Sequence, residues 1–177
     1  MTTDEIATTL KQADEAVLEE ILREAEARLS AQLTAAIAAD QRAMTFLGFL
    51  GAITVFLLGA AIAALTAQSP STSIAAVAAL GAVGFVGASC LAYQAWKPID
   101  FEFVGNDPSS WLGDIAGGVK LAAAKAEQCA FYDAMLKDNR KAMERSGRWL
   151  TRSVWTAAAT VGICAATAIA KLFLGGL

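Results

Sequence analysis

Two long stretches of the chain lack charged side chains. The first covers residues 43–96, a run of 54 positions without Asp, Glu, Lys or Arg, and the second covers the 18 residues 153–170. A helix needs about 20 mostly apolar residues to cross the hydrocarbon core of a membrane, so the first stretch accommodates two spans and the second one. Pro70 lies among small polar residues, and the helix of the first span should end there. The predicted spans lie near residues 44–67, 74–95 and 154–170.

The N-terminal arm, residues 1–43, has the pattern of one amphipathic helix that continues into the first span. Its leucines and alanines recur at steps of three, four or seven, with acidic and basic positions between them. Thr2 and Glu5 have the spacing of a capping box at its start. Asp40 and Arg42 are the last charges before the span and mark the predicted juxtamembrane site.

Residues 96–152 form the second polar segment. Pro98 should end the second span, and Asp107 followed by Pro108 is typical of a helix start. We expect a break near Gly117 and Gly118 and a helix over residues 119–152. The apolar face of that helix recurs at every seventh position: Ala122, Cys129, Leu136, Met143 and Leu150. This spacing is typical of a coiled coil, although charges flank it, and we expect it to dock on the N-terminal helix or on a neighbouring copy.

These patterns predict an all-α integral membrane protein with three transmembrane helices and a helical cytoplasmic part. The predicted organisation is a cytoplasmic amphipathic helix (1–43), a transmembrane hairpin (44–95), a cytoplasmic loop and helix (96–152) and a third span with a short outer tail (153–177). A buried hairpin in a soluble protein would need far more polar chain to cover it.

Composition agrees with this class and excludes several others. Hydrophobic residues make up 56% of the chain and 40 positions are alanine, against roughly 45–50% apolar residues in ordinary soluble proteins. A disordered chain, a collagen and a disulfide scaffold are excluded. Residues 1–43 carry nine acidic and four basic side chains, which argues against nucleic-acid binding and leaves no pattern of a cleavable signal peptide.

The distribution of Lys and Arg predicts the orientation. Residues 1–43 and 97–152 together hold 13 basic side chains, the loop between the first two spans holds none, and the C-terminal tail holds only Lys171. By the positive-inside rule, the N-terminus and the middle segment face the cytoplasm, and the C-terminus faces outside.

Small residues suggest where the spans pack. On the third span they recur at every fourth position (Ala158, Gly162, Ala166 and Ala170), and on the second span Gly84 and Ala88 have the same spacing. Small side chains let helix backbones approach closely, which is how helices associate in lipid. We expect membrane lipid and further copies of the chain, in a homo-oligomer, to be its partners.

The sequence offers no catalytic, cofactor or metal-binding pattern. It contains no histidine, no paired-cysteine motif and none of the glycine-rich phosphate loops, so we predict neither an enzyme nor a zinc site. No charge lies in the middle of a span, which argues against an ion-coupled transporter. A pore lined by small and hydroxyl side chains stays open as an alternative.

The order of segments resembles one known group. A charged helix enters the first span through Asp40-Gln41-Arg42-Ala43, and a two-span hairpin, a cytoplasmic helical segment and a further span follow. This order is similar to that of SLATT-type proteins and of bacterial Pycsar-type transmembrane effectors. The resemblance implies a membrane-impairing antiphage effector of the bacterial inner membrane that assembles and responds to a small nucleotide. The alternative is a non-catalytic accessory or scaffold subunit of a larger membrane complex.

Overall fold

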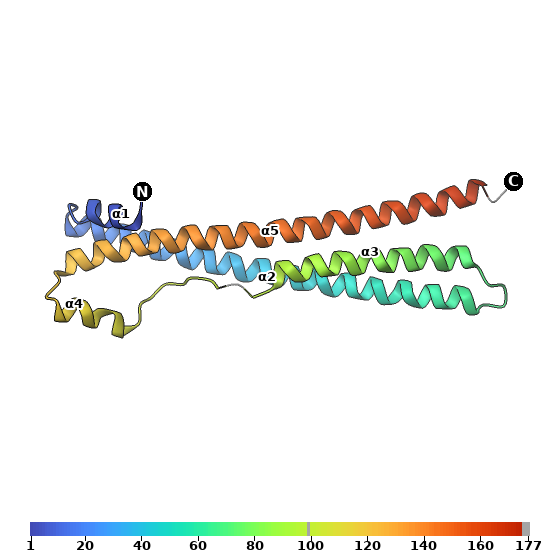
Figure 1. Ribbon diagram of the computed structural model, residues 1–177, viewed down its shortest axis with the longest axis horizontal. Helices are drawn as coiled ribbons and strands as arrows, with labels where there is room; N and C mark the ends of the chain where they lie inside the picture. The colour runs from blue at the N-terminus through green and yellow to red at the C-terminus, as the bar shows by residue number, and fades with distance from the viewer. Residues whose placement is uncertain (99, 175–177) are drawn as a thin grey trace. The chain divides into compact units, whose positions relative to one another are not determined.

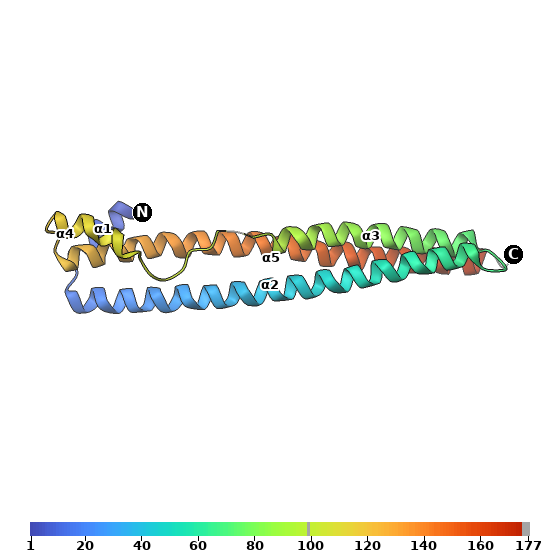
Figure 2. The ribbon, with the colours of Figure 1, turned by 90° about the horizontal axis from the view of Figure 1, so that it is seen from below.

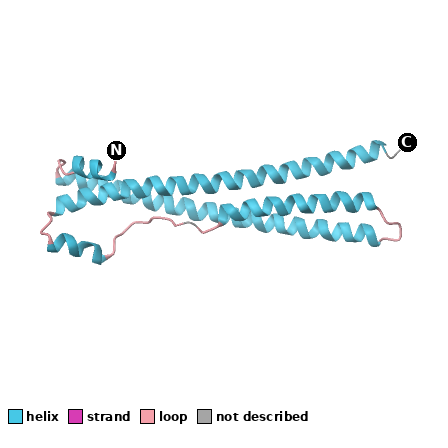
Figure 3. Cartoon of the chain, viewed as in Figure 1, coloured by secondary structure: helices cyan, strands magenta, loops and turns pink. Residues whose placement is uncertain are grey.

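The computed structural model describes residues 1–98 and 100–174 and is helical, with no strand in this part of the chain (Figures 1 and 3). In chain order the elements are α1 (Thr3–Leu10), α2 (Glu15–Thr66), α3 (Thr72–Trp96), the 3₁₀ helix η1 (Pro108–Trp111), α4 (Leu112–Ala116) and α5 (Leu121–Leu174). Three of them, α2, α3 and α5, are long and apolar enough to cross a membrane. The predicted all-α class is confirmed, and the three helices fit a multi-pass membrane protein.

The chain divides into two compact units. The charged unit comprises Met1–Ala38 and Ile99–Glu144, and the apolar unit comprises Ala39–Pro98 and Arg145–Leu177. Helices α2 and α5 contribute residues to both units. The predicted helix over residues 119–152 and the predicted third span therefore belong to one helix, because no residue between them breaks α5.

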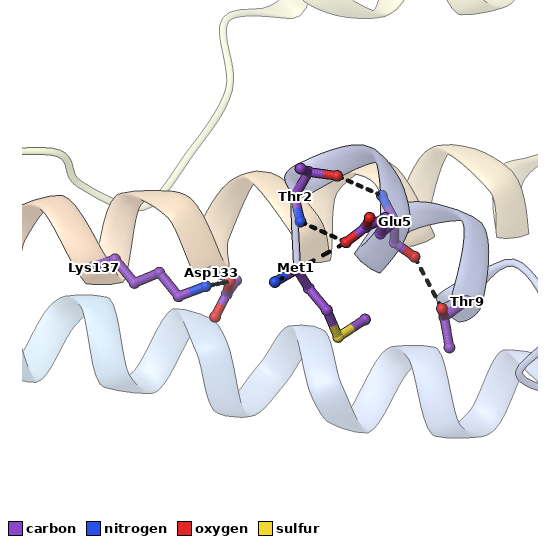
Figure 4. Close-up of polar contacts among 6 residues, drawn as sticks. All are labelled: Met1, Thr2, Glu5, Thr9, Asp133 and Lys137. Carbon is purple, nitrogen blue, oxygen red and sulfur yellow. Dashed lines mark hydrogen bonds and ion pairs between the residues drawn. The ribbon is translucent and has the colours of Figure 1, made fainter.

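The start of the chain confirms one local prediction and corrects another. The Thr2 hydroxyl accepts a hydrogen bond from the Glu5 N–H at 3.3 Å, and the Glu5 carboxylate accepts one from the Thr2 N–H at 2.9 Å, which completes the capping box (Figure 4). The prediction of one unbroken helix through residues 1–43 is wrong, since α1 ends at Leu10. Asp14 then accepts a hydrogen bond from the Val17 N–H at 2.9 Å, which satisfies one of the free donors at the start of α2.

Within the charged unit, the first part of α2 packs against the first part of α5. Leu18 and Leu29 of α2 are fully buried, and so is Ala126 of α5. Lys125 of α5 donates to Glu19 at 2.7 Å and to Glu15 at 3.3 Å. These hydrogen bonds, that to Glu19 above all, raise the pKa of Lys125 above its ordinary value. Contacts between residues more than a hundred positions apart thus hold the unit together.

Glycine and proline end the helices where the sequence predicts. Helix α3 ends at Trp96, before Pro98, and α4 is followed by Gly118, whose φ of +64° is a backbone conformation that side chains disfavour. Pro108 occupies the first turn of η1, as expected. Asp107 occupies the predicted N-cap position, but its side chain makes no capping hydrogen bond there.

The apolar unit has a narrow core and an apolar exterior. Leu50, Phe85, Ala88, Ala92 and Ala157, from α2, α3 and α5, form a buried cluster. Figures 1 and 2 show these parts of the three helices running alongside one another. Large side chains such as Val55 and Phe56 are exposed. In water this surface would be unfavourable, whereas in lipid it is matched by the acyl chains.

Candidate functional site

Helices α3 and α5 meet through small and hydroxyl side chains. The buried Ser153 hydroxyl donates to the Ala88 carbonyl oxygen at 2.6 Å. One turn before Ala88 on α3, a Cβ atom on Gly84 would lie 2.5 Å from Cγ2 of Thr160 and closer still to its Oγ1. The predicted packing residues Gly84 and Ala88 therefore both lie in this contact. Their partners on α5 are Ser153 and Thr160, which the spacing of small residues in the sequence did not reveal.

The predicted stripe on α5 is not part of that contact. Ala158, Gly162, Ala166 and Ala170 are all exposed, and a Cβ atom on Gly162 would meet nothing within 4 Å. The face that packs within the chain carries Ser153, Ala157 and Thr160, all buried. Because small residues predominate over residues 153–170 of α5, a four-residue period alone could not identify the face that meets α3.

The seven-residue pattern of α5 lies on its covered side. Cys129 is buried, and Ala122, Leu136, Met143 and Leu150 are half-buried. Cys129 donates through its thiol to the Leu18 carbonyl oxygen at 3.9 Å, and Gln32 of α2 donates to the Leu136 carbonyl oxygen at 3.2 Å. In the charged unit, α2 therefore covers part of this face. Burial raises the pKa of the Cys129 thiol, which disfavours the reactive thiolate.

A buried asparagine holds the connection that follows α3. The Glu102 N–H donates to Oδ1 of Asn139 at 2.9 Å, and Nδ2 of Asn139 donates to the Glu102 carbonyl oxygen at 2.8 Å. Asn139 is only 1% exposed although it lies on a helix. The side-chain amide of Asn139 therefore pairs with both backbone groups of Glu102, as the backbone of a neighbouring strand would. The signal in the sequence was an amide side chain on the covered side of α5.

The charged unit contains a cavity of about 350 Å³ between α5 and the segment formed by η1 and α4. The residues that line it are Asn106, Ser110, Trp111, Asp114, Ala124, Glu127, Gln128, Phe131 and Met135. Nδ2 of Asn106 donates to Oε1 of Gln128 at 2.9 Å across one side. The lining has two carboxylates and no Lys or Arg, so it offers no cation to a phosphate group. This cavity does not suit the phosphate of the nucleotide that the layout resemblance implies.

The predicted juxtamembrane charges lie on the exposed surface of α2. Asp40 and Arg42 are both exposed and precede the uncharged part of the helix. On α5 the corresponding boundary carries Arg152, whose guanidinium carbon lies 4.9 Å from the centre of the Trp149 ring. Such a contact places the cation over the aromatic face.

Comparison with known proteins gives no assignment for this chain. Its sequence matches no protein-family model and no curated protein, and its structure matches no solved structure. Any function must therefore be argued from the residues and their geometry.

Proposed function

We propose that this chain is a three-span protein of the bacterial inner membrane that acts by self-association, as a membrane-impairing effector rather than as an enzyme. The observation that carries the proposal is the exposure of the small-residue stripe on α5. Four small residues at a four-residue spacing suit close helix packing, yet no helix among the described residues covers them. A second copy of the chain would supply the missing helix.

The structure around Gly162 favours a contact between helices over a purely lipid-facing surface. Flexible lipid chains pack against an apolar helix whether or not it carries glycine. The backbone of a second helix, by contrast, gains van der Waals contacts where glycine lets it approach closely. The packed face of α5 is already used by α3, through Ser153 and Thr160. Self-association through the stripe would therefore leave the fold of each copy unchanged.

Substitution of Gly162 tests the proposal. Gly162→Leu would insert a large side chain into the proposed contact, and we expect self-association in detergent to weaken by roughly 1–3 kcal/mol, or about fivefold to more than a hundredfold. The measurement is the mass of the purified protein by sedimentation equilibrium over a range of concentrations. Gly87→Leu is a matched control on α3, because a Cβ at Gly87 also meets nothing within 4 Å. A monomeric wild type, or equal effects of both substitutions, would contradict self-association through the stripe.

Substitutions of Leu136 distinguish an effector from an accessory or scaffold subunit. For an effector, overexpression of the wild type should harm cells, and Leu136→Asp should abolish the harm while the protein still inserts, because the carboxylate disrupts the covered face of α5. Leu136→Ala should reduce the harm to cells less than Leu136→Asp does. For an accessory subunit, the wild type should be harmless and should copurify with other chains in a defined ratio, and Leu136→Asp should lose them.

A further inference from the structure

The two units carry opposite formal charges. The charged unit holds sixteen acidic and eight basic side chains, a formal charge of −8, and the apolar unit holds one acidic and six basic side chains, a formal charge of +5. The single acid of the apolar unit is Asp40. The excess of positive charge therefore belongs to the part of the chain that is suited to lipid.

Most of this positive charge lies at one end of the apolar unit. The Ser146 hydroxyl donates to the Ala95 carbonyl oxygen at 2.6 Å, so the last turn of α3 lies beside the first residues that α5 contributes to the unit. Lys97 caps α3 there, and Lys171 is near the opposite end of α5. The basic residues on the near side of the uncharged runs are Arg42, Lys97, Arg145, Arg148 and Arg152.

Arg145 and Arg152 each precede a serine that bonds to α3, Ser146 and Ser153, so they lie beside the face of α5 that meets α3. Their spacing of seven residues is two helical turns, which puts them on one face about 10.5 Å apart along the axis. Both are exposed, whereas Ser153, which bonds to α3, is fully buried. Arg148 lies between them and already has an interaction partner, as has Glu144. The face therefore presents two arginines at different depths.

Two tryptophans lie within one helical turn of Arg152 on α5. Its guanidinium lies 4.9 Å from the centre of the Trp149 ring, and Trp155, one turn further into the uncharged run, is 71% exposed. An exposed tryptophan beside an arginine is typical of the level of the lipid headgroups. Stacking on Trp149 also orients the planar guanidinium, and a guanidinium can bind phosphate oxygens through two parallel hydrogen bonds.

We propose that Arg152, with Trp149 and Trp155 beside it and Arg145 further from the apolar run, forms a binding surface for the phosphate groups of anionic phospholipids. Lipid is the ligand that fits this surface, because the surface borders directly on the apolar part of the helix. Each arginine near an anionic bilayer contributes about 1 kcal/mol to binding, or roughly fivefold in affinity. The inference rests on the proposed membrane insertion and is independent of self-association.

The test compares lipid binding in nanodiscs made of phosphatidylcholine alone or with added phosphatidylglycerol. For the full-length protein we expect native mass spectrometry to retain phosphatidylglycerol in preference to phosphatidylcholine, with a preference that falls as salt is raised. Arg145→Gln combined with Arg152→Gln should reduce the preference about 25-fold, from two contributions of roughly fivefold. Lys171→Gln removes one basic charge near the other end of α5, and this control should lower the preference by no more than the roughly fivefold contribution of a single charge.

Folding and insertion are checked separately. Equal unfolding temperatures of the wild type and the double variant in phosphatidylcholine alone would show that the arginines are not needed for the fold. Equal retention of both lipids by the wild type, or an equal loss in Lys171→Gln, would overturn the lipid surface and leave membrane insertion intact. Failure of the wild type to float with lipid vesicles would overturn the proposed membrane location as well.

Discussion

Thr160 of α5 occupies the space that a side chain on Gly84 of α3 would need. The nearest atoms to a Cβ atom at Gly84 are the Oγ1, Cγ2 and Cβ atoms of Thr160, with Cγ2 at 2.5 Å and Cβ at 3.0 Å. Thr160 cannot easily rotate away, because branching at Cβ restricts its rotamers on a helix and its hydroxyl donates to the Thr156 carbonyl oxygen at 2.8 Å. Glycine at position 84 therefore sets how closely α3 and α5 approach.

Gly84→Ala should separate these two helices. We expect the free energy of unfolding in detergent to fall by about 1–3 kcal/mol, the usual cost of overpacking. Gly87→Ala is the control, since its added methyl group would meet nothing within 4 Å. In a Thr160→Ala background the cost of Gly84→Ala should shrink, and an undiminished cost would show that some other contact is responsible.

Asn139→Ala should release the segment that follows α3. The substitution removes both hydrogen bonds to the backbone of Glu102, and each such bond contributes about 0.5–1.5 kcal/mol. We expect faster proteolytic cleavage within residues 100–107 and faster hydrogen exchange at the Glu102 amide. Asp138→Ala, at the exposed neighbouring position, should leave both rates unchanged. Unaltered protection in Asn139→Ala would mean that the segment is held by other contacts.

Cys129 should react slowly with alkylating reagents in the folded protein. Burial raises the pKa of its thiol, so less thiolate is present near pH 8.5, where an ordinary cysteine is about half ionised. The protonated thiol contributes stability that is fully present below the ordinary thiol pKa and is lost as the pH rises through the raised value. Mass spectrometry of iodoacetamide labelling, with the denatured chain as reference, measures the rate at this residue. Equal rates in both states would contradict its burial.

The orientation can be tested with reporter fusions. A reporter that is active only outside the cytoplasm should be active after Leu177 and silent when inserted within residues 120–141. The reason is the imbalance of 13 basic side chains against one. The reverse pattern of activity would show that the basic residues do not set the topology of this chain.

Local chemistry determined most of the helix ends, although not the break between α1 and α2. The uncharged runs located the three apolar helices, Pro98 and Gly118 marked where helices end, and Thr2 with Glu5 marked where α1 begins. Each of these signals acts within a few residues: proline lacks an N–H, glycine tolerates positive φ, and a capping side chain bonds to its own backbone. Such features can be predicted from sequence because their partners are near in the chain.

The tertiary structure decided which faces meet. Ser153 with Ala88, Asn139 with Glu102 and Gln32 with Leu136 are all contacts between residues 37 or more positions apart. On α5 almost every side is rich in alanine, so the sequence suggested the stripe through Gly162, whereas the chain packs the side that carries Ser153 and Thr160. A hydroxyl can satisfy a carbonyl of another helix only where the two backbones come close, and that distance depends on the arrangement of all three helices rather than on any local pattern.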